Sequence, residues 1–531
     1  MSEVHRFVAD RSPDVGTGEN TDADTDAGTL SLVTRLGLRE VEVTDLDRRF
    51  FDTPDGRLHG MGTTLEVRTP VEYPMMRSLV WLHGGQVLAS ARVDAAFEPG
   101  LADTLPPGAG FDRLRDTIEM RRLLPVAMVR SRLALAAALD TEEKTTARVV
   151  IDLPALRDGR PLPALIEIRA IRGYEDATAR LVRRIAGTAG VDPTDLTTPD
   201  LARAAGGGRP FVPSRLTVQL DRGADAATVW TEVFRALHES MLVNFTGTLD
   251  DVDSEYLHDF RVAVRRTRSV LAEGGGVLDG RARDHFRAGF KWLGDITTPT
   301  RDADVHLLDY PKMLAALSED AATALAPLGE FLIAHQRTCQ QQLARELRGP
   351  RRAQLAAEWA EYLEGSGPWA ERPAGPDAGR SARRVVAARV EKAHRRLRRD
   401  GRAIGATSPP VALHDLRKDA KRLRYLLECF GPLFPAEDLA TAVRPLKALQ
   451  EVLGEFQDTE VQAGALARFG RRLDEEGADT DTILAMGGAI EQLSVRSSRA
   501  RRAYADRFAE FDTGAVRRAY ERLTTTRKGG R

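Results

Sequence analysis

The sequence predicts an α+β protein of more than one domain, in which an antiparallel β domain precedes an all-α domain of two duplicated four-helix bundles. Three observations predict this class. About the first 200 residues alternate apolar and charged side chains at period two, and later segments place apolar residues at helical spacing. A glycine- and proline-rich segment, Ala205 to Pro213, separates the two patterns. Within the helical part, Leu257–Leu271 is echoed at Leu413–Leu427.

These boundaries define the expected domains. We expect a β domain over residues 1–204, a linker over 205–213 and a helical domain over 214–526. Inside the helical domain we expect one repeat from about 214 to 364, a linker over 365–379 and a second repeat from about 380 to 526. An acidic, low-complexity loop over 18–29 has no assigned role.

Composition limits the function classes. The chain has 77 lysines and arginines against 78 acidic residues, so any site for a polyanion must be a local patch. Its two cysteines, Cys339 and Cys429, provide neither a disulfide framework nor metal-ligand spacing. The first residues lack a signal-peptide pattern and no apolar run is long enough to span a bilayer, so we expect a cytoplasmic protein with no membrane partner.

In the β domain, charged residues alternate with apolar ones, as in Leu65-Glu66-Val67-Arg68 and Ile166-Glu167-Ile168-Arg169. One face of the sheet is therefore charged, although such a face can simply be solvated. The segments Phe50–Pro54, Leu65–Arg68, Ser78–Leu82 and Ile166–Arg172 resemble the CYTH, or triphosphate-tunnel, family. The resemblance implies an eight-stranded antiparallel tunnel in which acids hold Mg²⁺ or Mn²⁺ and cations bind a triphosphate.

The resemblance also implies candidate residues in the tunnel. The triphosphate-binding candidates are Arg68, Arg130, Arg132 and Arg169, and the catalytic candidates are Glu3, Arg68 and Glu167.

The chain departs from the family at its metal ligands. The family's opening Glu-x-Glu-x-Lys strand reads Glu3-Val4-His5-Arg6-Phe7, and neither registration of this segment keeps both acids. The later Glu-x-Glu pair reads Glu167-x-Arg169. We therefore assign no metal site and expect weak or absent hydrolysis; Mg²⁺ or Mn²⁺ is needed only if the domain is active.

The repeated segments predict two cationic helices. His258, Arg261, Arg265 and Arg268 fall within a stripe roughly 80° wide on a helix, beside an apolar seam. The copy repeats this phase, and Arg266 and Arg422, about 80° from the stripes, are second-choice candidates for binding phosphate. The copy's stripe consists of His414, Arg417, Lys421 and Arg424. Paired stripes suit a polyanion, whereas a single one is more often a solvated face and a lone histidine more often packs in a core.

A third basic helix is predicted before the second stripe. Its cations again have helical spacing and are secondary candidates: Arg389, Lys392, Arg396 and Arg399.

The helical domain resembles the CHAD family, named for a histidine-bearing α-helical domain. The blocks that carry the resemblance are His258–Arg266, Trp292–Gly294 with Arg301-Asp302, His414–Lys418 and Lys421–Tyr425. The resemblance implies binding of inorganic polyphosphate, association with polyphosphate granules and a basic channel between two four-helix bundles.

From the stripes and the resemblance together, we expect inorganic polyphosphate binding that requires no cofactor. If His258 and His414 donate to phosphate, binding should strengthen below their pKa. Three alternatives remain: a metal-dependent triphosphatase or polyphosphatase whose helical domain captures substrate, a scaffold for an acidic protein partner, and a nucleic-acid binder. Few aromatic residues alternate with the cations, which argues against nucleic acid.

Overall fold

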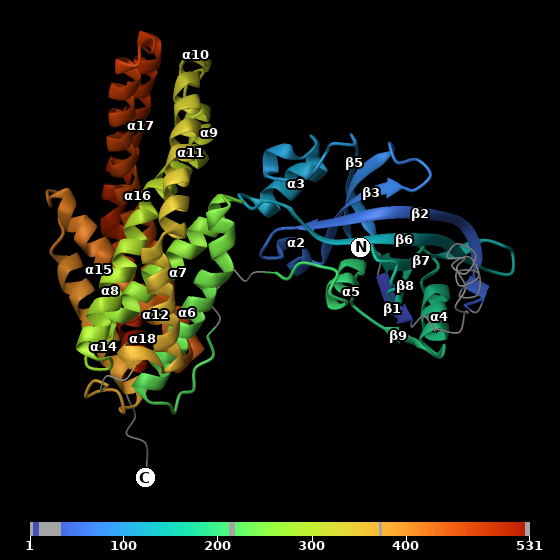
Figure 1. Ribbon diagram of the computed structural model, residues 1–531, viewed down its shortest axis with the longest axis horizontal. Coiled ribbons are helices and arrows are strands. Elements are labelled where there is room, and N and C mark those ends of the chain that lie inside the picture. The colour runs from blue at the N-terminus through green and yellow to red at the C-terminus, as the bar shows by residue number, and fades with distance from the viewer. Residues whose placement is uncertain (1–3, 10–32, 35, 212–217, 371–373, 526–531) are drawn as a thin grey trace. The chain divides into compact units, whose positions relative to one another are not determined.

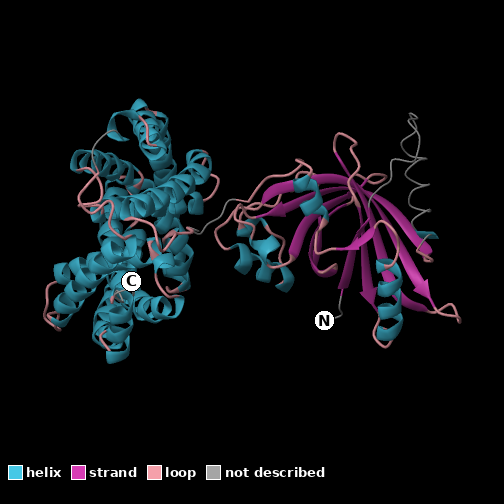
Figure 2. Ribbon diagram, turned by 90° about the horizontal axis from the view of Figure 1, so that it is seen from below, coloured by secondary structure: helices cyan, strands magenta, loops and turns pink. Residues whose placement is uncertain are grey.

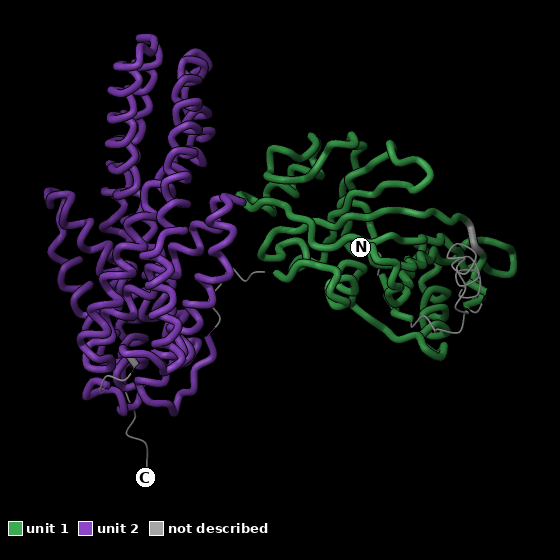
Figure 3. Tube along the Cα trace, in the orientation of Figure 1, with its two compact units in different colours: residues 1–213 green, residues 214–531 purple. Residues whose placement is uncertain are grey.

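The computed structural model describes residues 4–9, 33–34, 36–211, 218–370 and 374–525. Glu3 and the acidic loop over 18–29 lie outside these residues. The chain divides into two compact units, residues 1–213 and 214–531 (Figure 3). We call them the β unit and the helical unit.

The described part of the β unit contains a strongly curved antiparallel sheet (Figure 2). Its strand order is β5-β4-β3-β2-β6-β7-β8-β1-β9, so the sheet has nine strands where the resemblance implied eight. This confirms the antiparallel β architecture. The strands are β1 (Val4–Ala9), β2 (Arg39–Asp52), β3 (Thr63–Pro70), β4 (Arg77–His83), β5 (Gln86–Val93), β6 (Leu124–Leu139), β7 (Thr145–Leu156), β8 (Ala164–Ala170) and β9 (Val191–Pro193).

Apolar cores cover one face of this sheet. Helix α3 (Ala109–Ile118) packs Phe111 and Leu114 on β3 and β4, and α4 (Glu175–Ala186) packs Leu181 and Ile185 on β7 and β8. Since successive side chains of a strand point to opposite faces, the alternating charged residues lie on the other face. The remaining short elements are α2 (Arg57–Gly60), η1 (Ala102–Thr104) and α5 (Thr198–Ala204).

The described part of the helical unit contains long helices joined by short connections (Figure 1). The all-α character predicted for this part of the chain is confirmed. The elements are α6 (Ala226–Leu249), α7 (Ser254–Glu273), α8 (Gly280–Ile296), α9 (Thr298–Ala315), α10 (Glu319–Ala324), α11 (Ala326–Arg348), α12 (Pro350–Glu364), α13 (Gly367–Ala370), α14 (Ala382–Arg402), α15 (Pro410–Cys429), η2 (Gly431–Leu433), α16 (Ala436–Glu475), α17 (Thr480–Phe511) and α18 (Gly514–Thr524).

The two halves follow the spacing of the sequence repeat. Helix α15 begins and ends 156 residues after α7, and α14 begins 156 residues after α6. The single helix α16 replaces the pair α8 and α9. Pro299 lies in the first turn of α9, where proline is tolerated but cannot continue a preceding helix, and Glu455 occupies the equivalent place in α16. This spacing agrees with a duplication, which stays a prediction.

One apolar core joins both halves of the helical unit. Trp230 and Phe234 of α6 belong to the same buried cluster as Leu416 and Leu423 of α15 and Phe430 after it. The halves therefore share a core, because α7 and α15 both turn their apolar seams into it.

A second core holds four extended helices together. Helices α9, α11, α16 and α17 project beyond the rest of the helical unit (Figure 1). Their cluster combines Leu328 and Leu332 of α11 with Leu466 of α16 and Met486 of α17. Among the described residues, no helix has both the length and the apolar character needed to cross a membrane.

The shared core predicts a large cost for truncating Leu423, whose side chain is 0% exposed. Leu423→Ala should lower the free energy of unfolding of the helical unit by about 2–5 kcal/mol, because it removes buried contacts and leaves a cavity. Urea unfolding followed by helical circular dichroism measures this change. Leu242→Ala is the control, since Leu242 is 58% exposed; an equal loss in both variants would contradict the shared core.

Candidate functional site

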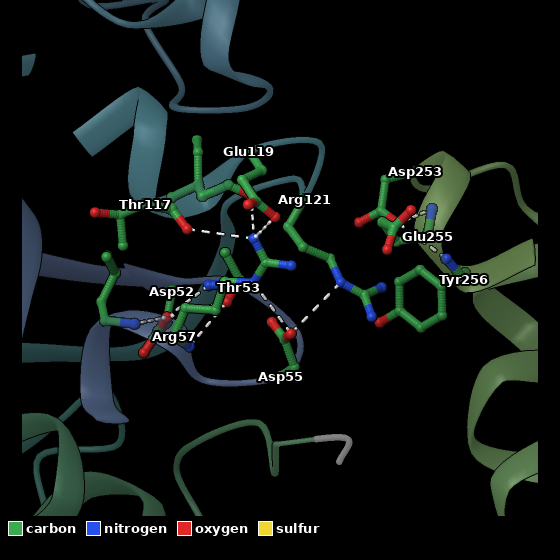
Figure 4. Close-up of polar contacts among 12 residues, drawn as sticks. Asp52, Thr53, Asp55, Arg57, Thr117, Glu119, Arg121, Asp253, Glu255 and Tyr256 are labelled. Carbon is green, nitrogen blue, oxygen red and sulfur yellow. Dashed lines mark hydrogen bonds and ion pairs between the residues drawn. The ribbon is translucent and has the colours of Figure 1, made fainter. Parts of the chain in front are cut away.

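Helix α7, which carries the first cationic stripe, has a defined start. The carboxylate of Asp253 accepts the backbone N–H groups of Glu255 and Tyr256, each at 3.0 Å (Figure 4). An N-cap of this kind satisfies donors that would otherwise lack partners and contributes about 1 kcal/mol. It sets the helix register that places the stripe on one face.

Two ion pairs join α7 to α15 in opposite directions. Arg266 of α7 donates from Nη2 to Glu428 of α15 at 2.9 Å, and Arg422 of α15 pairs with Glu273 of α7. Glu273 is buried, so the second pair is anchored on a desolvated carboxylate. Arg266 and Arg422, both predicted as phosphate ligands, therefore also hold the two cationic helices together.

A groove of about 850 Å³ lies between α7, α8 and α15. It is bordered by cations from both repeats and by two acids. The charged lining residues are Arg265, Arg268, Arg287, Lys291, Lys421, Arg422, Glu273 and Asp284. Ser269, Ala272, Ala288 and Tyr425 complete the lining. The structure thus brings Arg265 and Arg268 of the first stripe to the same space as Lys421 of the second.

The cations of the groove differ in their partners. Arg287 lies 3.7 Å from Asp284, and Lys291 pairs with Asp295 at 2.6 Å. Within the described part of the chain, Arg265, Arg268 and Lys421 form no ion pair within 4 Å. Three cations therefore face the groove without a carboxylate to neutralise them.

Mutual repulsion and burial change the chemistry of Lys421. Burial, followed by the charges of Arg417 and Arg265, lowers the pKa of Lys421 from 10.5 to about 8. An anion in the groove reverses part of this effect because it favours the charged amine.

The remaining arginines of the stripes lie beyond the groove lining. Arg261 donates from Nη1 to the hydroxyl of Thr297 at 2.6 Å and to the carbonyl of Gly294 at 3.2 Å. Arg417 donates to Asp458 at 3.0 Å. Arg424 donates to Glu428 at 2.6 Å and to Gln450 at 3.1 Å. These arginines are oriented by the protein itself, with fewer donors left for a ligand.

Two stripe arginines have a buried guanidinium nitrogen without an acceptor among the described residues, as do arginines elsewhere in the chain. The Nε atoms of Arg265 and Arg417 are buried and, among the described residues, have no hydrogen-bond acceptor. A buried donor without a partner costs about 1–3 kcal/mol, which an anion at the stripe could recover.

The histidines of the stripes do not line the groove. His414 is half-buried and its Nδ1 lies 2.6 Å from Oε1 of Gln457. His258 is half-buried near the start of α7. Donation from either ring to phosphate stays a prediction.

The secondary stripe of α14 does not contribute to the groove. Arg389 donates to the carbonyl of Gly275 and lies over the ring of Trp230. Arg396 pairs with Asp419 at 2.9 Å, and Arg399 with Asp400 at 2.7 Å. Lys392 is exposed. The partners of Arg389 and Arg396 lie 114 and 23 residues away in the sequence, so helical spacing alone could not reveal them.

The site predicted from the sequence did not include Arg287 and Lys291 of α8. They are four residues apart and therefore share a helix face, which was the available signal. Nothing in their spacing indicated that this face lies opposite Arg265.

The β unit has a separate pocket of about 100 Å³ on the charged face of its sheet. Its arginines are paired with its acids. Arg48 bridges Glu66 at 2.6 Å and Asp152 at 2.5 Å, and Arg68 also reaches Glu66 at 2.6 Å. Although burial opposes ionisation of Glu66, Arg48 and Arg68 hold its pKa below the ordinary value. These residues form a neutralising network inside the sheet.

A second network in this pocket surrounds Glu167. Arg6 of β1 pairs with Glu167 at 3.2 Å, and Arg169 pairs with it at 2.8 Å. Phe7 packs in the apolar core on the opposite face. Strand β1 therefore turns Arg6 into the pocket. When the family's Glu-x-Glu-x-Lys motif is aligned so that its Lys falls on Arg6, this is the place that the motif gives to that Lys.

Two predicted tunnel residues lie elsewhere. Arg130 and Arg132 of β6 face away from the pocket and pair with Asp47 at 3.0 Å and Asp45 at 2.9 Å. The reason is strand alternation, because Ser131 between them contacts Arg48 in the pocket. The prediction that both line the tunnel is wrong. Arg48, which was not singled out, is the arginine that β2 directs inward.

The carboxylate of Asp52, in the Phe50–Pro54 motif, forms hydrogen bonds to the backbone. It accepts the backbone N–H groups of Thr53 at 2.7 Å, Leu58 at 2.9 Å and His59 at 2.8 Å (Figure 4). It thus fixes the turn into α2. Among the described residues, no group of three His, Cys, Asp or Glu side chains could hold a metal ion.

Comparison with known families addresses the helical unit. The family model of the CHAD domain matches residues 232–467. This segment is a CHAD domain. All residues that line the groove fall inside it, whereas the shared apolar core continues past it to Phe511 of α17 and Tyr520 of α18.

Solved structures that match parts of this chain were also found. The CHAD domain from the plant Ricinus communis is 24% identical with a TM-score of 0.47, over 57% of this chain and 96% of that one. PptA from Streptomyces chartreusis is 18% identical with a TM-score of 0.43, over 54% of this chain and 100% of that one. A putative adenylyl cyclase from Hippeastrum, reported to have a dominant triphosphatase activity, is 15% identical with a TM-score of 0.27, over 40% of this chain and 98% of that one. No curated protein matches the sequence.

The paired carboxylates of the β unit predict no metal-dependent hydrolysis. Tripolyphosphate with Mg²⁺ or Mn²⁺ should release no phosphate above background, because Arg48, Arg68 and Arg169 already neutralise the acids that would bind the metal. A phosphate-release assay measures this. Rapid turnover that Arg68→Ala abolishes would contradict the prediction.

Proposed function

We propose that the protein binds inorganic polyphosphate in the groove between α7, α8 and α15. One observation carries this proposal: Arg265, Arg268 and Lys421, contributed by both repeats, face the same groove and form no ion pair within the described chain. Cations held close together in a protein repel one another, so a ligand with regularly spaced negative charges relieves that repulsion.

The chemistry of these groups favours phosphate. A guanidinium donates two parallel hydrogen bonds to the oxygens of one phosphate, and a lysine acts as a point charge. A linear polyphosphate presents anionic oxygens along its whole length, which matches a row of cations along two packed helices. The binding requires no metal.

The lining of the groove favours polyphosphate over nucleic acid. Tyr425 is the aromatic residue among its lining, so the groove offers little surface for stacking successive bases. An acidic protein partner remains the competing ligand, because carboxylates also bind arginine in a bidentate manner. The proposal includes association of the whole protein with polyphosphate granules.

The β unit contributes no metal catalysis to the proposal, and its arginines are paired with acids. Its pocket holds four arginines, Arg6, Arg48, Arg68 and Arg169, against three acids, Glu66, Asp152 and Glu167. We infer a CYTH-like domain that has lost most of its triphosphatase capacity.

The test is a titration of long-chain polyphosphate into the full-length protein at two salt concentrations. Arg265→Glu combined with Lys421→Glu should weaken binding by at least about 100-fold, because two attractive contacts become repulsive. Binding to the unaltered protein should weaken at higher salt, since the contacts release counterions.

Lys392→Glu combined with Arg399→Glu is the matched control. It makes the same charge change on exposed residues of α14, outside the groove. Equal losses in the two double variants would show that only net charge matters and would remove the groove from the proposal. Stronger competition by an acidic peptide than by polyphosphate would favour the scaffold.

Lys421 also predicts the pH dependence of binding. Its pKa is about 8 in the free protein, and bound phosphate raises it, so binding takes up a proton above that pH. The contribution of Lys421 to affinity should be constant below about pH 7 and fall as the pH rises through 8 to 9.5. Lys421→Arg should remove this fall because arginine stays charged. An unaltered slope in that variant would assign the pH dependence to another group.

A further inference from the structure

Lys421 stands out among the cations of the stripes. The chain contains 77 lysines and arginines, and only eight are lysines: Lys144, Lys291, Lys312, Lys392, Lys418, Lys421, Lys447 and Lys528. At the equivalent place of the first stripe the chain has Arg265. An amine and a guanidinium differ chemically, because a neutral amine is a nucleophile and arginine is never deprotonated in proteins.

We propose that Lys421 is an acylation site for acyl phosphates, whose phosphate group is held by the arginines of the groove. This inference rests on the proposed phosphate binding of the groove and adds a covalent modification to it. The reagent is identified by its chemistry: a phosphate for Arg265 and Arg268 and an activated acyl carbon for the amine.

The reaction balances without a further component. The neutral amine of Lys421 attacks the acyl carbon, and a C–N amide bond forms. The bond between that carbon and the bridging phosphate oxygen breaks, and inorganic phosphate leaves with the electron pair. The proton lost by nitrogen passes to phosphate or solvent. Arginines that bind phosphate also stabilise the charge that develops on this leaving group.

The geometry supports the reaction at Lys421 in particular. Its side chain lines the same groove as Arg265 and Arg268, so an acyl phosphate held by these arginines occupies the space that the amine borders. Lys421 makes no ion pair within the described chain, so no carboxylate needs to be displaced.

Charges on three neighbouring helices act on this amine. Arg417 and Arg424 of α15 and Arg265 of α7 disfavour its charged form, whereas Asp458 of α16 favours it. On α8, the groove is lined by two cations and an acid: Arg287, Lys291 and Asp284. Burial, together with these cations, outweighs Asp458 and lowers the pKa of Lys421 to about 8, so a substantial fraction of the amine is neutral near pH 7.5.

Lys418 provides an internal reference three residues away. It lies on the same helix, is exposed, and pairs with Asp415 at 3.0 Å. It is outside the groove lining. A reagent that acts on accessibility alone would modify Lys418 first.

Acylation would change the ligand site. It replaces the charge of Lys421 with a neutral amide and places an acyl group in the groove. Polyphosphate and acyl phosphate should therefore exclude one another, the first by occupying the arginines and the second by neutralising the lysine.

The experiment treats the full-length protein with acetyl phosphate at about pH 7.5 and follows each lysine by peptide mass spectrometry. Lys421 should be acetylated about tenfold faster than Lys418, and excess tripolyphosphate should suppress the reaction at Lys421 alone. Lys421 reacting no faster than Lys418, or reacting equally with tripolyphosphate present, would overturn the proposal.

Arg268→Gln separates phosphate recognition from the reactivity of the amine. Arg268 lines the groove but is not among the largest contributions to the lowered pKa of Lys421. The variant should acetylate several-fold more slowly at Lys421 with acetyl phosphate and at an unchanged rate with the uncharged reagent p-nitrophenyl acetate. Equal rates with acetyl phosphate in both proteins would contradict docking by phosphate.

The two proposals fail in different ways. Polyphosphate binding that depends on Arg265 and Lys421, without preferential acetylation, would leave the proposed function in place and overturn only the acylation site. Loss of polyphosphate binding from the groove together with acetylation that tripolyphosphate does not suppress would overturn both.

Discussion

The helical unit depends on holding two positively charged helices side by side. Helices α7 and α15 each carry a row of cations, and their repulsion has to be offset by other contacts. The crossed ion pairs Arg266–Glu428 and Arg422–Glu273 do this at the helix surfaces, and the shared apolar core does it beneath them. Removing one partner of such a pair costs more than the pair contributes, because it leaves a desolvated charge.

This arrangement explains why some cations of the two helices are paired with acids and others are not. Acids are present beside the stripes, but they contact the flanking arginines. Glu428 pairs with Arg266 and Arg424, and Glu273 pairs with Arg422. No ion pair is formed in the described chain by Arg265, Arg268 and Lys421. The charge needed for binding is therefore generated by the distribution of acids around the helices, in a protein whose net charge is −1.

The sequence predicted the architecture and part of the candidate site. Period-two and helical spacing are local properties, so the antiparallel sheet, the helical unit and the stripes of α7 and α15 could be inferred. Whether each cation is paired with an acid could not be inferred, since the partners of Arg396 and Arg417 are 23 and 41 residues away in the sequence. In the β unit, motif resemblance suggested Arg130 and Arg132, but strand register directs them outward and brings Arg48 inward.

The unbroken helix α16 runs from the second stripe into the core of the projecting helices, and α11 and α17 also contribute to both apolar cores. Gln450 and Asp458 on this helix contact Arg424 and Arg417 of the second stripe, and Leu466 and Leu473 further along it belong to the core of the projecting helices. From Gln450 to Leu473 the helix runs for about 35 Å without a proline. The first half has no equivalent rod, because Pro299 marks a new helix there. The second stripe is thus connected to the projecting helices through one continuous helix, α16. The first stripe is connected to them through two helices, α8 and α9, which meet next to Pro299.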